Sequence, residues 1–134
     1  MKISWYLAGA IFIGGALGTI VRYLINVQTM FTLYPIGTLI ENIAGSFLLG
    51  ALTRYVLHRK PREVWKAGLG VGFCGSLTTM STLAADAFML AGENSITASA
   101  LYIGMSLSGG LLVALAGFMM ADKLGKKKEA VTGD

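Results

Sequence analysis

Four apolar runs, each long enough to cross a bilayer, constrain the fold of this chain more than any other feature. They lie at roughly residues 4–25, 35–57, 65–90 and 98–121. A helix of about 20 residues crosses the hydrocarbon core of a bilayer. The runs leave little chain for a soluble domain, in agreement with a composition that is 54% hydrophobic and 13% charged. We therefore predict one all-α membrane domain over residues 1–134, with four transmembrane helices.

A polar interruption divides the third run at residues 75–82, where the sequence reads GSLTTMST. Inside a bilayer every freed backbone N–H or C=O needs a partner in the protein, because water is absent. One interpretation is a broken helix whose carbonyl groups hold a cation. The other is a helix–helix contact that requires small side chains. We predict that the third helix is broken near the membrane midplane.

Polar side chains also recur at helical spacing in the second and fourth runs. Thr38, Asn42 and Ser46 stand four residues apart and share one helix face. An amide inside a membrane must find hydrogen-bond partners, either on a neighbouring helix or on an anion that passes it. Both interpretations of Asn42 remain open from its position. In the fourth run, Tyr102 and Ser106 form a second row of hydroxyl groups.

Basic residues gather on one side of the predicted membrane domain. With four spans, the N-terminus, the loop after the second span and the C-terminal tail share that side. Its basic residues are Lys2, Arg54, Arg59, Lys60, Arg62, Lys66, Lys123, Lys126, Lys127 and Lys128. Such residues favour the cytoplasm, so we expect a multi-pass protein of the plasma or inner membrane with both termini cytoplasmic. The membrane topology therefore explains the net charge of +4, and we infer no nucleic-acid partner from it.

Several other features limit the function. The single Cys74 excludes an internal disulfide and a cysteine-based zinc cluster. His58 lies in a basic loop, as expected of a surface charge. No phosphate-binding loop, zinc motif or nucleophile motif is present, so we predict no enzymatic activity.

The polar tail at 123–134 is expected to be disordered.

Two charged residues lie within the predicted membrane region near the short loop that joins the first two helices. Arg22 stands near the end of the first run and Glu41 near the start of the second, at similar depth. Charges inside a membrane are costly unless they are paired or hydrated. We predict that Arg22 and Glu41 interact. The alternative is that each separately faces a hydrated vestibule.

Three stretches together resemble the CrcB/Fluc family of small fluoride channels. They are GGALGTIVRY at 14–23, GTLIENIAGS at 37–46 and GFCGSLTT at 72–79. The resemblance covers all four predicted helices in order. It implies an antiparallel dimer of four-helix subunits in the lipid membrane, with two fluoride pores. It also implies a structural sodium ion at the dimer centre, held by backbone carbonyl groups that correspond here to Gly75 and Thr78.

The resemblance also assigns an ion pathway. Its positions in this chain are Asn42, Met80, Ser81, Thr82, Leu83, Tyr102 and Ser106. Met80 and Leu83 stand where the family usually has phenylalanines, whose positive ring edges can face an anion. Neutral amide and hydroxyl donors at the other positions suit fluoride, because a pore must bind its ion weakly enough to release it.

The missing phenylalanines and the uneven basic residues both favour a heterodimer with an oppositely oriented homologue, although a homodimer is possible. One alternative is a non-conducting subunit that supports a partner channel. Another, less favoured, is a proton-coupled exporter of the small multidrug resistance type. Such exporters use a carboxylate in the middle of the first helix, and residues 4–25 contain no acid.

Overall fold

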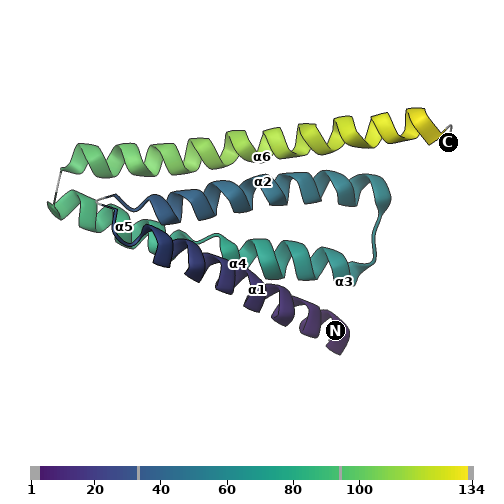
Figure 1. Cartoon of the computed structure of the whole chain (residues 1–134), viewed down its shortest axis with the longest axis horizontal. Coiled ribbons are helices and arrows are strands. Elements are labelled where there is room, and N and C mark those ends of the chain that lie inside the picture. The colour runs from purple at the N-terminus through teal and green to yellow at the C-terminus, as the bar shows by residue number, and fades with distance from the viewer. Residues whose placement is uncertain (1–3, 33, 94, 133–134) are drawn as a thin grey trace.

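The described part of the chain is helical. The computed structural model describes residues 4–32, 34–93 and 95–132, with no strand among them. The elements are α1 (Trp5–Thr29), α2 (Ile36–Arg59), α3 (Glu63–Lys66), the π-helix η1 (Ala67–Cys74), α4 (Gly75–Leu77), α5 (Met80–Glu93) and α6 (Ile96–Thr132). Figure 1 shows α2 and α6 side by side along most of their length, with α1, α3 and α4 on the other side of α2. The α5 helix packs mainly against the first part of α6.

Among the described residues, three helices are long and apolar enough to cross a membrane. They are α1, α2 and the Ile96–Lys126 part of α6. The remaining predicted span, residues 65–90, is divided among α3, η1, α4 and α5. None of these four elements alone has the length of a membrane span.

Glycines set the distance between the packed helices. A Cβ at Gly14 or Gly18 would overlap main-chain oxygens of Gly68 and Phe73, which lie on η1. A Cβ at Gly50 on α2 would overlap the main-chain oxygen of Ala114 on α6. Backbones approach this closely only where no side chain intervenes. The glycines therefore position η1 against α1, and α6 against α2.

The tail differs from its prediction. Residues from Lys123 onward were expected to be disordered, but α6 continues as a helix to Thr132. Lys, Glu and Ala in this stretch are good helix formers. Extending an existing helix also avoids the cost of nucleation. Residues 133–134 lie outside the described part of the chain.

Substituting the close-packed glycines should separate α2 from α6. We expect Gly50→Ala and Gly117→Ala each to lower the stability by about 1–3 kcal/mol, because the added methyl group meets backbone. The measurement is thermal unfolding of the purified protein in detergent. Gly104→Ala on α6 is the matched control, since no atom lies within 4 Å of its Cβ position. Equal loss of stability in the control would contradict this packing.

Candidate functional site

The chain leaves helical geometry inside the predicted polar interruption. α4 ends at Leu77, Thr78 is extended with φ −80° and ψ 150°, and α5 begins at Met80. The Thr79 hydroxyl oxygen accepts a hydrogen bond from the backbone N–H of Thr82 at 3.2 Å. A threonine in this position caps the first turn of a helix. Thr79 therefore starts α5 after the interruption.

Asn42 of α2 holds the non-helical stretch through two hydrogen bonds. Its Oδ1 accepts the backbone N–H of Thr79 at 2.7 Å, and its Nδ2 donates to the backbone oxygen of Thr79 at 3.0 Å. Of the two interpretations of Asn42, the structure therefore supports an interhelical bond directly. An amide carries two N–H groups. The described residues provide an acceptor for one of them, so the second can serve another partner.

The backbone oxygens of Gly75 and Thr78, which we expect to hold a cation, lie close in sequence to Thr79 and its two hydrogen bonds with Asn42. Thr78 donates its backbone N–H and its hydroxyl to the backbone oxygen of Cys74, at 3.1 and 3.0 Å. Within the described part of the chain, we found no hydrogen bond to the backbone oxygen of Gly75 or of Thr78. Gly75 is exposed on the surface of the single chain, and Thr78 is half-buried. Backbone carbonyl oxygens without donors are suitable ligands for a hard cation.

A cavity of about 430 Å³ brings most of the predicted site residues together. The predicted residues that line it are Asn42, Gly75, Thr78, Met80, Leu83 and Ser106. Thr79 and Ser46 add two more hydroxyl groups, and the lining includes no charged residue. Met80 is 68% exposed, whereas Leu83 is buried against Ala87, Leu90 and Tyr102. The cavity thus combines neutral hydrogen-bonding groups with apolar side chains.

A second cavity, of about 390 Å³, lies toward the loop that joins α1 and α2. Thr82 lines this cavity together with Thr38 and Asp86. The Thr79 hydroxyl, which lines the first cavity, lies 3.1 Å from the hydroxyl groups of both Ser81 and Thr82. A short chain of hydroxyl groups therefore connects the two cavities.

Two predicted pathway residues, Ser81 and Tyr102, line neither cavity, and Tyr102 is bound elsewhere. Its hydroxyl donates to Oδ2 of Asp86 at 3.0 Å, and both residues are buried. The hydroxyl of Tyr102 is therefore committed to a carboxylate. Spacing along the helix could place Tyr102 and Ser106 on one face, but it could not reveal that Asp86 on α5 approaches that face.

The predicted interaction of Arg22 with Glu41 is present only as the effect of the Arg22 charge on the Glu41 carboxyl group, without direct contact. Across the described residues no ion pair joins them. Oε1 of Glu41 instead accepts a hydrogen bond from Nδ2 of Asn26 at 2.8 Å, and that nitrogen also donates to the backbone oxygen of Arg22. Glu41 is fully buried, and none of the described residues offers its Oε2 a hydrogen bond. Asn26 follows the apolar run at 4–25 and was expected in a loop, whereas α1 continues to Thr29 and carries Asn26 to Glu41.

These features define a small helical membrane protein with a neutral polar cavity at an interruption between two helices. The model of the family described as "CrcB-like protein, Camphor Resistance (CrcB)" matches residues 9–118. "Fluoride-specific ion channel FluC 2" of Halalkalibacterium halodurans is 52% identical over 125 residues, which cover 92% of each chain. The protein of the same name from Bacillus subtilis is 41% identical over 116 residues, covering 86% of this chain and 87% of that protein.

The chain therefore belongs to the CrcB family of fluoride-specific ion channels. This family membership confirms the resemblance drawn from the three sequence stretches. It also confirms that the chain belongs to a channel family and not to an enzyme family.

Removing the Asn42 amide should loosen the backbone at Thr79. In Asn42→Ala the backbone N–H of Thr79 loses its acceptor, and we expect its hydrogen exchange to accelerate about tenfold or more, as loss of one buried hydrogen bond predicts. Amide exchange measured by mass spectrometry on the purified protein reports this change. Ser46→Ala, in the same cavity, should leave exchange at Thr79 unaltered. Unchanged exchange in Asn42→Ala would show that other contacts hold this stretch.

Proposed function

We propose that this chain is a subunit of a fluoride channel that exports cytoplasmic fluoride through the cavity at Asn42. The observation that carries the proposal is the uncharged lining of this cavity, with an amide and several hydroxyl groups. Fluoride is small and strongly hydrated, so these donors must replace part of its water. Neutral donors do so without the tight binding that a fixed positive charge would cause.

The proposed route continues from the first cavity to the second along the hydroxyl groups of Thr79, Ser81 and Thr82. The 3.1 Å separations between these groups support a relay of weak sites for one anion. Ser106 supplies a hydroxyl group on the α6 side of the first cavity. Asp86 lines the second cavity, so the route ends beside a carboxyl group that would favour release of an anion.

The backbone oxygens of Gly75 and Thr78 would hold the structural sodium ion. Their lack of hydrogen-bond donors among the described residues fits this role, because carbonyl oxygens suit a hard cation. The ion would add positive potential beside the pathway without obstructing it. Two oxygens are too few for a complete sodium site, so a second subunit would supply the remainder.

An antiparallel dimer would complete both the cation site and the pathway. Gly75 and Met80 are exposed in the single chain, which leaves the first cavity open to a partner. Residues 65–90 would form the fourth crossing, divided at Thr78. The concentration of basic residues at the end where α2 meets α3, and in α6 beyond Ala121, supports a fixed orientation with both termini in the cytoplasm.

We favour a homologous partner of opposite orientation over a second copy of this chain. Met80 and Leu83 supply no aromatic ring edge to the pathway. Leu83 is also buried in a packed cluster, so a phenylalanine there would require repacking. One relative, from Bacillus subtilis, is named FluC 2, and another, from Bacillus cereus, is named FluC 1. Such numbering is consistent with two homologous subunits in one organism.

Fluoride efflux from liposomes tests the proposal. We expect little efflux with this chain alone and rapid efflux after co-reconstitution with the homologue encoded in the same genome. Efflux is followed with a fluoride electrode, and chloride serves as the control anion. Absence of fluoride efflux both alone and with the homologue would refute the channel proposal. Rapid efflux by this chain alone would refute the need for a different partner.

The same assay separates a conducting subunit from one that only supports its partner. In the mixed dimer, Asn42→Ala should reduce efflux about tenfold or more if fluoride passes this chain, since a hydrogen-bond donor is lost. Ser108→Ala is the control, because that hydroxyl donates to the backbone oxygen of Gly104 on α6. Size-exclusion chromatography must show intact dimer in both variants. Unreduced efflux in Asn42→Ala would favour the supporting role.

Sodium should stabilise the assembled protein. We expect the melting temperature to rise with sodium concentration, as for any ligand of the folded state, but not with N-methylglucamine at equal ionic strength. Thr78→Ser should show the same response, because the proposed ligand is a backbone oxygen and serine retains the hydroxyl that donates to Cys74. A melting temperature that is independent of sodium would exclude the ion site.

A further inference from the structure

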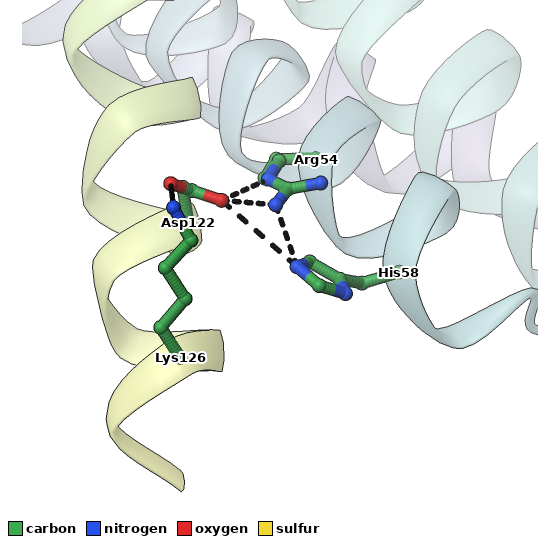
Figure 2. Close-up of polar contacts among 4 residues, drawn as sticks. All are labelled: Arg54, His58, Asp122 and Lys126. Carbon is green, nitrogen blue, oxygen red and sulfur yellow. Dashed lines mark hydrogen bonds and ion pairs between the residues drawn. The ribbon is translucent and has the colours of Figure 1, made fainter. Parts of the chain in front are cut away.

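A cluster of charged side chains joins α2 to α6 near the C-terminal end of α2, and none of its residues lines either cavity of the proposed route. Figure 2 shows that Asp122 lies between Arg54 and Lys126. Arg54 donates through Nε at 2.6 Å and also through Nη2, both to Oδ1 of Asp122, and Lys126 lies 3.0 Å from Oδ2. Nη2 of Arg54 also lies 2.6 Å from Nε2 of His58. The single carboxylate of Asp122 thus pairs with two positively charged side chains, Arg54 and Lys126. The cluster therefore keeps a net positive charge.

Arg54 is held in one orientation by these contacts. Its guanidinium group also lies over the ring of Phe118, 5.6 Å from the centroid, and its side chain is only 18% exposed. An arginine has five N–H groups, and the contacts of Arg54 use those on Nε and Nη2. In Figure 2, Nη1 points away from Asp122. Its two N–H groups are fixed in direction, which suits binding of a phosphate oxygen.

Two adjoining cavities meet beside this arginine. The first, of about 490 Å³, is lined by Arg54, His58 and Arg59. The second, of about 390 Å³, is lined almost wholly by apolar groups, including Leu52 of α2 and Phe73 of η1. Tyr55 and Ala121 line both cavities, so the two are contiguous. A basic compartment therefore continues directly into an apolar one.

We propose that these cavities form a binding site for one anionic phospholipid. Arg54 and Arg59 bind the headgroup phosphate, and an acyl chain occupies the apolar cavity between α2 and η1. The apolar cavity favours a lipid over free phosphate, because a free anion would leave it without an occupant. Basic residues at the membrane surface attract anionic lipids, and here a fixed guanidinium adds a defined contact. The site shares no lining residue with the cavities of the fluoride route, so it does not depend on conduction.

Competition between lipids tests the site. The purified protein is exchanged into nanodiscs with equal amounts of phosphatidylglycerol and phosphatidylcholine, and the lipids that remain bound are identified by native mass spectrometry. We expect phosphatidylglycerol to be retained preferentially. In Arg54→Gln/Arg59→Gln this preference should fall about fivefold per charge removed.

The matched control removes two charges from the same end of the molecule but outside the cavities. In Arg62→Gln/Lys66→Gln we expect a change below about twofold, because neither residue lines the cavities and charges away from the site are screened by salt. An equal fall in this control would overturn the site in favour of general surface charge. Absence of any preference in the unmodified protein would overturn it as well.

Two further variants keep the test decisive if loss of Arg54 disturbs folding. Arg59→Gln lies outside the Asp122 cluster and should by itself reduce the preference. Leu52→Trp fills the apolar cavity and should reduce lipid retention with every basic residue intact. Retention unaffected by Leu52→Trp, or displacement of the lipid by inorganic phosphate alone, would show a free-anion site and overturn the proposal.

Discussion

The structure depends on the pair of hydrogen bonds between the Asn42 amide and the backbone of Thr79. A helix interrupted inside a membrane exposes N–H and C=O groups that water cannot satisfy there. Asn42 satisfies both groups of Thr79, and the Thr79 hydroxyl caps α5. These contacts leave the backbone oxygens of Gly75 and Thr78 without donors from the described residues. The proposed cation site is thus a direct consequence of how the interruption is stabilised.

The helices around the interruption are positioned by residues that lack side chains. Gly45 of α2 admits Thr78, since a Cβ there would overlap the methyl group of Thr78. On the opposite side, Gly18 of α1 lies against the backbone of Phe73. The Thr78 methyl group on the α2 side and the main chain of Phe73 and Leu77 on the α1 side thus fit against glycines on either side of the interruption. The cavity therefore owes its shape to glycines as much as to the polar groups that line it.

Periodicity and composition predicted the parts of this structure that depend on local sequence. The polar run at 75–82 contains the point where helical geometry ends, at Thr78, and the four-residue spacing identified Asn42. Contacts between distant side chains were beyond such reasoning. Glu41 bonds to Asn26 rather than to Arg22, and Tyr102 bonds to Asp86, because these partners depend on how neighbouring helices are rotated. The prediction that the transported ion is fluoride came from the family resemblance, because no residue spacing in the chain identifies a particular anion.

We propose that the Asn42 amide, which holds the interruption, also faces the permeating ion. Solid-state NMR of the Asn42 side-chain nitrogen, in the reconstituted protein that conducts fluoride, tests this most directly. We predict that fluoride shifts the Nδ2 resonance in a saturable way and that chloride at the same concentration does not. An Asn42 resonance that is unchanged by fluoride while efflux proceeds would show that the ion takes another route.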